Sequence, residues 1–161
     1  MSRTTRTIAI TTVLCLLAFN AQGQDASTEN LATSRLQSLM DIYWSYRLAE
    51  SPTLATAAGM NDYNHLLPQV APLDRSRRLR AEQEFLLQLG DIDRTALNLE
   101  NQINYDLLGW VLEISIESME LNTDRIPFNT FSSFFTGALR ASYGVSMTTE
   151  EDYQAYTSRI R

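Results

Sequence analysis

The stretch NLENQINYDLLGWVLEISIESMEL, residues 98–121, decides the fold class because it carries the clearest helical pattern in the chain. Asn98 is a good N-cap, since its side chain can accept a hydrogen bond from a backbone N–H of the first turn. Apolar residues then recur at helical spacing, which predicts a helix to about Glu120. The residues predicted to face the core are Ile103, Leu107, Trp110, Ile114 and Leu121, and the outer face carries Glu113, Glu117 and Glu120.

Further helices are predicted on the N-terminal side of this stretch. Residues 27–50 predict a helix that Pro52 stops, and a short helix is predicted over 52–58. A second long helix is predicted from an N-cap at Asp74 to about Leu89, with Gly90 as its stop. The residues predicted to face the core are Ala32, Leu36, Leu39, Tyr43 and Tyr46 on the first helix and Leu79, Leu86 and Leu89 on the second.

The C-terminal part predicts helices as well. A shorter helix is predicted after Pro127, to about Ala141, and Thr148 with Glu151 predicts a capping box for a last helix that runs to Arg161. No strand, repeat or flexible linker is evident. The sequence therefore predicts an all-α protein, an irregular multi-helix array that forms a single region over residues 24–161.

The N-terminus has the layout of a secretory signal peptide over residues 1–23. Arg3 and Arg6 precede an apolar stretch of about a dozen residues, whereas a membrane span needs about 20. Ala21 and Gly23 are small residues at the positions that signal peptidase recognises, so cleavage is expected between Gly23 and Gln24. Export to the periplasm or secretion is predicted, without a stable membrane span after cleavage. An uncleaved membrane anchor is the alternative.

Charge and cysteine content exclude some classes of protein. The 161 residues include 13 basic and 19 acidic side chains, a net charge of -6. This argues against a nucleic-acid-binding protein, which needs surplus positive charge to bind phosphates. Cleavage would remove two arginines and no acid, leaving 11 basic and 19 acidic residues and a net charge of -8. It would also remove Cys15, the single cysteine, so the mature chain could form no disulfide.

The candidates for catalysis or metal binding are weak. His65 is the single histidine, and with no mature cysteine the sequence disfavours a self-contained zinc site. A Ser-His-Asp arrangement through His65 stays open, although no G-x-S-x-G motif is present. Glu113, Glu117 and Glu120 share a helix face and could form a cation site, but a solvated outer face is favoured.

Two other groups of residues favour structural interpretations. The first group is a basic cluster, which is predicted to form surface ion pairs with Glu82 and Glu84 at i, i+4 spacing. It consists of Arg75, Arg77, Arg78 and Arg80. The second group is an aromatic run, which could pack under a neighbouring layer or line a ligand groove, and packing is the favoured interpretation. It consists of Phe128, Phe131, Phe134 and Phe135.

The chain resembles a known bacterial family in five pieces that occur in order. They are Asp41-x-x-Trp44-x-x-x-Leu48-x-x-x-Pro52-x-x-Ala55-Thr56-x-x-Gly59-x-x-x-Tyr63, Leu89-x-x-Ile92-Asp93-x-x-x-Leu97-x-x-Glu100, Ile103-Asn104-Tyr105-Asp106, Pro127-Phe128-Asn129 and Glu151-Asp152-Tyr153-x-x-Tyr156-x-x-Arg159. Together they resemble the N-terminal region of the family named domain of unknown function 885 (DUF 885).

The resemblance implies a mostly helical exported protein of several hundred residues that looks like a gluzincin zinc metallopeptidase. In such enzymes an H-E-x-x-H helix and a downstream glutamate bind zinc. None of these residues has a counterpart here, so no catalytic or metal-binding residue is assigned, and zinc and a peptide substrate are expected only with a C-terminal part. What carries over is a structural role, as helices that form one wall of a substrate cleft.

Two hypotheses for the function follow. In the first, the chain is the non-catalytic N-terminal portion of a hydrolase of this kind and is inactive alone. In the second, it is a complete exported helical module that binds a partner without catalysis. The residues that would bind a substrate are not identified by the sequence.

Overall fold

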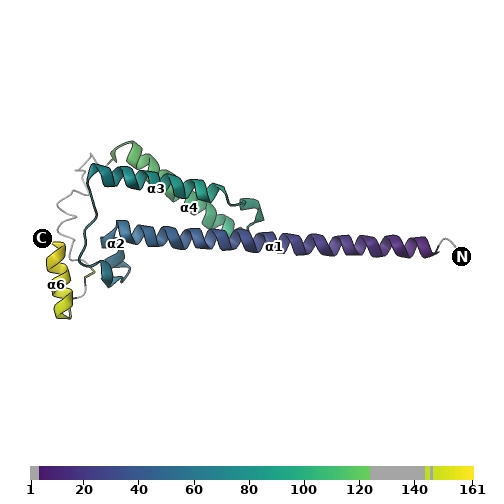
Figure 1. Cartoon of the computed structure of the whole chain (residues 1–161), viewed down its shortest axis with the longest axis horizontal. Coiled ribbons are helices and arrows are strands. Elements are labelled where there is room, and N and C mark those ends of the chain that lie inside the picture. The colour runs from purple at the N-terminus through teal and green to yellow at the C-terminus, as the bar shows by residue number, and fades with distance from the viewer. Residues whose placement is uncertain (1–3, 124–143, 146) are drawn as a thin grey trace.

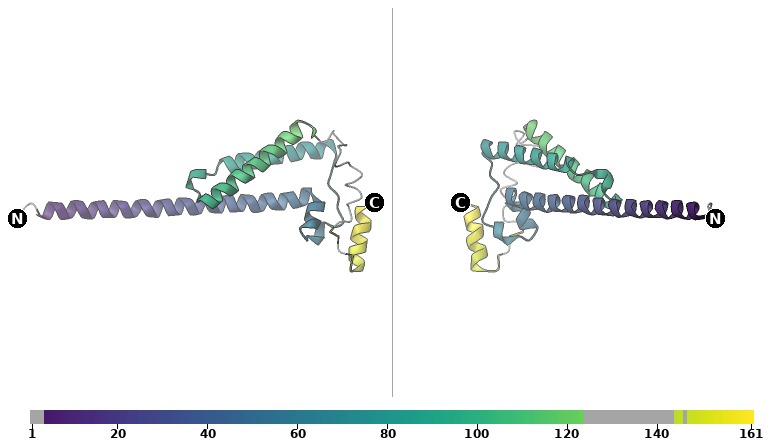
Figure 2. Two further views of the ribbon diagram at one scale, coloured as in Figure 1. Left: turned by 180° about the vertical axis from the view of Figure 1, so that it is seen from behind. Right: turned by 45° about the vertical axis from the view of Figure 1, so that its right-hand side comes forward.

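The computed structural model describes residues 4–123, 144–145 and 147–161, with side chains from Ser27 onward. Within these ranges the chain is helical and has no strand, as predicted. The long helix α1 (Thr4–Glu50) lies beside a hairpin of α3 (Pro72–Gly90) and α4 (Leu99–Glu120), as Figures 1 and 2 show. Helix α6 (Glu150–Arg159) lies at the end of the molecule where α1 stops. The predicted helix after Pro127 and the aromatic run fall outside the described residues.

Helix α1 begins at Thr4 and not near Ser27, so the predicted cleavage site between Gly23 and Gln24 lies inside it. Cleavage stays a prediction. The predicted inner face is confirmed, since α1 buries Ala32, Leu36, Leu39 and Tyr43 and partly buries Tyr46. The helix ends at Glu50, and Pro52 occupies the first position of α2 (Pro52–Ala57), where its missing N–H costs no hydrogen bond.

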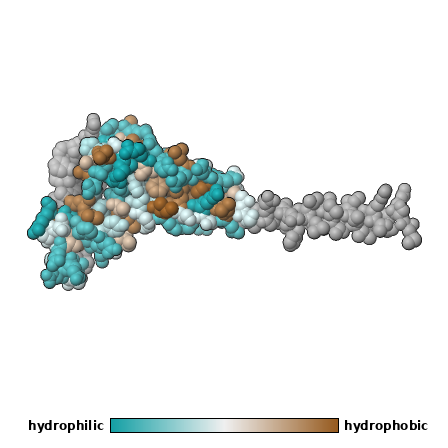
Figure 3. Space-filling model, in the orientation of Figure 1, coloured by the Kyte–Doolittle hydropathy of each residue, from teal (hydrophilic) through white to brown (hydrophobic). Residues whose placement is uncertain are grey.

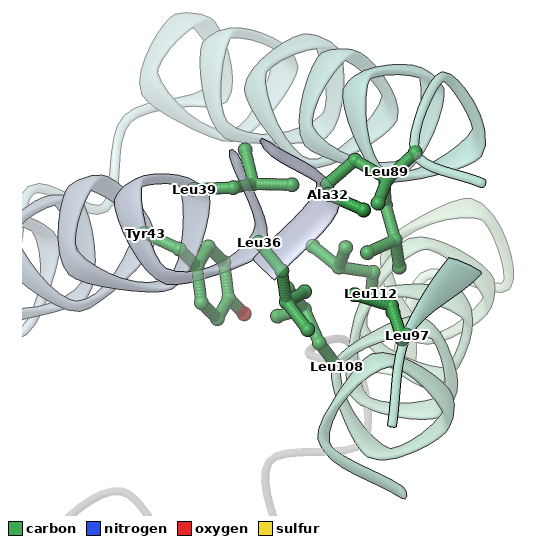
Figure 4. Packing of buried hydrophobic residues seen from close by; sticks show 9 residues of the cluster. Ala32, Leu36, Leu39, Tyr43, Leu89, Leu97, Leu108 and Leu112 are labelled. Carbon is green, nitrogen blue, oxygen red and sulfur yellow. The ribbon is translucent and has the colours of Figure 1, made fainter. Parts of the chain in front are cut away.

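The core lies where α1 meets the α3–α4 hairpin, and Figure 4 shows its side chains pointing toward one another. Leu36 of α1, Leu89 of α3 and Leu112 of α4 are almost fully buried. Gly109 of α4 lies against Leu89 of α3, since a Cβ there would be in ordinary van der Waals contact with the Leu89 Cδ2 atom, at 3.5 Å. The buried apolar cluster consists of Ala32, Leu36, Leu39, Tyr43, Leu89, Ile92, Leu97, Leu108 and Leu112.

Helix α4 packs through a different face from the predicted one. Leu108 and Leu112 are buried, whereas the predicted inner residues are all about half exposed or more. The exposed fractions are 52% for Ile103, 55% for Leu107, 60% for Trp110, 46% for Ile114 and 67% for Leu121. The prediction failed because α4 carries two apolar stripes on opposite faces, and periodicity alone cannot say which one meets the core.

The helix caps confirm some predictions and correct others. Asn98 caps α4, with its Oδ1 accepting from the Asn101 N–H at 3.0 Å. Helix α3 begins earlier than predicted, at Pro72 after Ala71, so Asp74 lies in its first turn and is not its cap. Gly90 is its last helical residue.

The capping box of α6 is shifted by one residue from Thr148 and Glu151 to Thr149 and Asp152. The Asp152 carboxylate accepts from the backbone N–H groups of both Thr148 and Thr149, at 3.0 and 2.9 Å, which selects the shifted pair. The helix ends at Arg159, with Ile160 as its C-cap, and does not run to Arg161 as predicted.

Candidate functional site

A buried polar cluster joins residues from the two ends of the family-like pattern. It consists of Thr56 at the end of α2, Asn64 after the 3-10 helix η1 (Asn61–Tyr63), and Arg159 of α6. All three side chains are 3% exposed or less. The Arg159 Nη2 donates to the Thr56 Oγ1 at 2.6 Å and to the Tyr63 carbonyl oxygen at 2.9 Å. These bonds dock α6 onto the segment that follows α1.

Local backbone geometry positions this Thr56–Asn64–Arg159 cluster. Gly59 has φ of 82°, and its N–H donates to the Thr56 carbonyl while the Met60 N–H donates to the Ala55 carbonyl. This is a Schellman ending, which turns the chain sharply after α2 and favours glycine at the left-handed position. The turn brings Asn64 back to Thr56, whose hydroxyl donates to the Asn64 Oδ1 at 2.7 Å.

Arg159 is the charged member of this cluster. Burial lowers its pKa, because the charged guanidinium loses water on leaving solvent. It nevertheless stays protonated at physiological pH, since arginine titrates far above that range. The two hydrogen bonds of the Arg159 Nη2 atom, to the Thr56 hydroxyl and the Tyr63 carbonyl, suit it to docking a helix, and the cluster contains no nucleophile with an adjacent base.

A second buried polar cluster lies between α1, α3 and α4. Glu82 of α3 is 2% exposed, accepts from the Tyr43 hydroxyl at 3.2 Å and lies 3.8 Å from the Arg47 guanidinium. Burial raises the pKa of Glu82 despite the opposing effects of Arg47, Tyr43 and Ser115. Burial, with Glu82 second, also raises the pKa of Tyr43 to about 12.

The same cluster contains an unsatisfied hydroxyl. Among the described residues, the buried Tyr46 hydroxyl has no hydrogen-bond partner. Its ring lies 5.2 Å from that of Phe85 and 6.2 Å from that of Tyr43, measured between centroids. Burial raises the pKa of Tyr46 to about 12, and nearby Glu82 and Glu50 act in the same direction. Tyr46 therefore acts as a packing residue in this cluster.

The sequence offered a signal for the buried position of Glu82. It lies three residues after Leu79 and four before Leu86, so it shares the predicted inner face of α3. The prediction of an i, i+4 surface pair with Arg78 was wrong. By contrast, only the structure could bring Thr56 and Arg159 together, because they are separated by most of the chain.

An apolar groove runs between α1 and α4. It has a volume of about 420 Å³, and its lining includes Met40 and Trp44 from α1 and Leu107 and Val111 from α4. Trp44 is 49% exposed and Leu107 55%. Figure 3, which shows one face of the molecule, likewise has apolar side chains at the surface over α1 and α3. The lining of this groove is mainly apolar, so it is a candidate binding surface for an apolar partner.

The predicted site residues do not assemble into a catalytic or metal centre. His65 is exposed in the loop after η1. Glu113, Glu117 and Glu120 are exposed on α4, as their interpretation as a solvated face requires. In the described part of the chain, no group of three or more His, Cys, Asp or Glu side chains is placed to hold a metal ion. No helix there is long and apolar enough to cross a membrane.

The basic cluster of α3 mainly joins α3 to other parts of the chain and does not form the predicted pairs with Glu82 and Glu84, although Arg77 also lies 3.5 Å from Asp74 of the same helix. The Arg77 guanidinium donates to both carboxylate oxygens of Glu50, at 2.5 and 2.9 Å, and this bond lowers the pKa of Glu50. Arg78 lies 3.5 Å from Glu50 and donates to the Gln69 carbonyl at 2.8 Å. Arg75 donates to the Met119 carbonyl near the end of α4 at 2.6 Å.

Other residues of the family-like pattern also have structural roles. Ile92 and Leu97 are in the core. Asp93 caps the 3-10 helix η2 (Arg94–Ala96) by accepting from the Thr95 N–H at 2.9 Å. Asp106 accepts two hydrogen bonds from Arg94, at 2.7 and 2.6 Å, which fasten η2 to α4. The pattern therefore specifies how the helices are joined.

Comparison with known proteins agrees with this pattern. No curated protein and no solved structure matches the chain. A family model described as "Bacterial protein of unknown function (DUF885)" matches residues 52–161, about two thirds of the chain. The matched range contains Thr56, Asn64 and Arg159, whereas Asp41, Trp44 and Leu48 of the resemblance precede it. The chain therefore belongs to the DUF885 family.

Proposed function

We propose that this chain is the non-catalytic helical portion of a longer exported DUF885 protein, whose full-length form resembles zinc-dependent peptidases. The observation that carries the proposal is that the family residues in hand join helices and contribute no catalytic group. His65 is the single histidine of the sequence, so a two-histidine zinc motif cannot come from this chain. The proposed role is to form one wall beside a peptide-binding cleft.

The mass of the native product in the cell envelope tests this proposal. An antibody against residues 24–161 would detect it in an extract of the source bacterium. We expect a band several times heavier than about 15 kDa, which is the mass of residues 24–161 alone at roughly 110 Da per residue. A band near 15 kDa would contradict the proposal, because the short chain would then be the whole protein.

We propose export through cleavage of residues 1–23. The basic start, the short apolar segment and the small residues Ala21 and Gly23 support it. N-terminal sequencing of the envelope product should begin at Gln24. Ala21→Arg should block processing, because signal peptidase requires a small residue there, and Thr28→Arg is a control outside the recognised positions. A product that retains Met1 would contradict cleavage.

A second candidate function is a stand-alone binding module, and the groove between α1 and α4 favours it. Under this alternative the purified chain is monodisperse, and its native mass is that of the short chain. Incubating the chain with a mixed peptide substrate, with and without added zinc, separates both candidates from a catalytic role. Hydrolysis that is lost on removing zinc would contradict the two non-catalytic proposals together.

A further inference from the structure

The exposed apolar stripe of α4 and the groove beside it form one surface. Ile103, Leu107, Trp110 and Ile114 recur at helical spacing and lie on the face of α4 opposite the buried Leu112. Leu107 also lines the groove, together with Trp44 and Val111. We call these six residues the α1–α4 apolar surface: Trp44, Ile103, Leu107, Trp110, Val111 and Ile114.

The dimensions of this surface suit a helix. The α4 stripe runs from Ile103 to Ile114, which corresponds to about 17 Å at 1.5 Å per residue. That length is about three turns of a partner helix. A shallow apolar groove between two helices is a common docking place for the apolar face of a third. A helix with apolar residues on both faces, like α4, is typically covered on both.

Acidic side chains flank the surface and indicate the charge of its occupant. Asp41 lines the groove on α1. Glu113 lies three residues after Trp110 and Glu117 three after Ile114, so each adjoins the stripe on α4. Among the described residues none forms an ion pair with Asp41, Glu113 or Glu117. A second copy of this acidic chain would bring like charges together, whereas a basic helix would neutralise them.

We propose that an amphipathic helix covers the α1–α4 apolar surface, with an apolar face flanked by Lys or Arg, contributed by the same longer polypeptide. This inference rests on the proposed function for the source of the helix. The apolar face packs on Leu107, Trp110 and Ile114, and the basic flanks meet Asp41, Glu113 and Glu117.

The test uses two synthetic 18-residue helical peptides that share a leucine face and differ only in having Lys or Glu on its flanks. The purified chain reports binding by its own fluorescence, since its two tryptophans, Trp44 and Trp110, both lie in the surface. We expect the Lys peptide to shift their emission to shorter wavelength and to bind at least about tenfold more tightly than the Glu peptide. No shift, or equal binding of both peptides, would overturn the inference.

Variants locate the binding. Ile114→Glu should abolish the shift, whereas Ile42→Glu should leave it unchanged, because Ile42 is also exposed but lines a different groove, with Gln88 of α3. Glu113→Lys with Glu117→Lys should reverse the preference toward the Glu peptide. An unchanged preference in that double variant would overturn the charge argument. Both substitutions are on exposed positions of α4, and a urea titration checks that the fold is intact.

The source of the helix is tested separately by the native mass. A heavy native product together with selective binding of the Lys peptide supports the whole inference. A native product of the short chain's mass would overturn the proposed function and the same-polypeptide source, while selective binding would still assign the surface to a basic helix of a separate protein. A heavy product without peptide binding would overturn the inference and leave the proposed function standing.

Discussion

At the scale of single residues, Tyr43 and Tyr46 have neighbouring rings, but their hydroxyls have opposite environments. The Tyr43 hydroxyl donates to Glu82, whereas the buried Tyr46 hydroxyl has no partner among the described residues. Tyr46→Phe should therefore raise the free energy of unfolding by about 1 kcal/mol, since it removes an unsatisfied buried group. Tyr43→Phe should lower it by about 1 kcal/mol, because Glu82 loses a donor. Urea denaturation measures both, and equal effects of the two substitutions would contradict this assignment.

Glu82 should make stability depend on pH in the opposite direction from an ordinary ion-paired carboxylate. Its folded-state pKa is raised above the usual 4.5, chiefly by burial, so the folded state binds the proton more tightly than the unfolded state does. The resulting stabilisation is fully present below pH 4.5 and is lost as the pH rises through the raised folded-state value.

Glu82→Gln should therefore have about the wild-type free energy of unfolding near pH 4 and exceed it increasingly toward pH 8. The measurement is urea denaturation over that range. Glu84→Gln is the control, because Glu84 is exposed on the same helix and its substitution should leave the pH dependence of the wild type unchanged. A wild type that gains stability over Glu82→Gln as the pH rises would show that the ion pair with Arg47 outweighs burial.

At the scale of elements, two glycines differ in what their positions require. Gly59 has φ of 82° in the turn after α2, a conformation that costs other residues about 1–2 kcal/mol. Gly90 is helical and a Cβ there would meet open space. Gly59→Ala should lower the free energy of unfolding by about 1 kcal/mol, and Gly90→Ala should raise it by about 0.5–1 kcal/mol. Thermal denaturation of both variants checks the contrast, and stabilisation by Gly59→Ala would contradict the turn geometry.

The docking of α6 depends on Arg159. A helix of 10 residues is marginal in water, so α6 needs its tertiary contacts to persist. Arg159→Lys keeps the charge but replaces a fork of donors by a point charge, and it should undock α6. Hydrogen exchange of the α6 amides should then become faster by tenfold or more, whereas Arg161→Lys, at an exposed position, should leave it unchanged. Unchanged exchange in Arg159→Lys would mean that other contacts hold the helix.

The elements also show how far sequence reasoning reaches. Helix periodicity correctly predicted the inner face of α1, because Ala32, Leu36, Leu39 and Tyr43 recur three or four residues apart. The exposed apolar residues of α1, which are Leu31, Ile42 and Trp44, do not have that spacing. It failed on α4, where Leu108 and Leu112 compete with Trp110 and Ile114, since the choice depends on which neighbour is present. Shifted capping in α6 has a similar cause, because Thr148 and Thr149 are equivalent by type and only the placement of Asp152 separates them.

The candidate site was less predictable than the fold. The buried position of Glu82 could be read from its spacing between Leu79 and Leu86. The contact between Thr56 and Arg159 could not, because it depends on how α6 returns to the end of α1. Likewise, the groove between α1 and α4 exists only because α4 turns its other apolar stripe toward the core.

At the scale of the whole molecule, net charge and exposed apolar area oppose each other. The chain carries a net charge of -6, which keeps copies apart at low ionic strength. The α1–α4 apolar surface favours association once copies come close. Salt shortens the range of the repulsion to about 10 Å at 0.1 M and leaves apolar attraction in place.

We therefore expect the purified chain to be monomeric at low salt and to associate progressively as salt is added, which light scattering after size exclusion measures. Trp110→Arg should keep it monomeric, because it places a charge in the middle of the stripe, where the side chain is 60% exposed and not part of the core. Ile42→Arg is the matched control on the other side of α1 and should still associate. Association that weakens with salt would mean that ion pairs, and not this surface, join the copies.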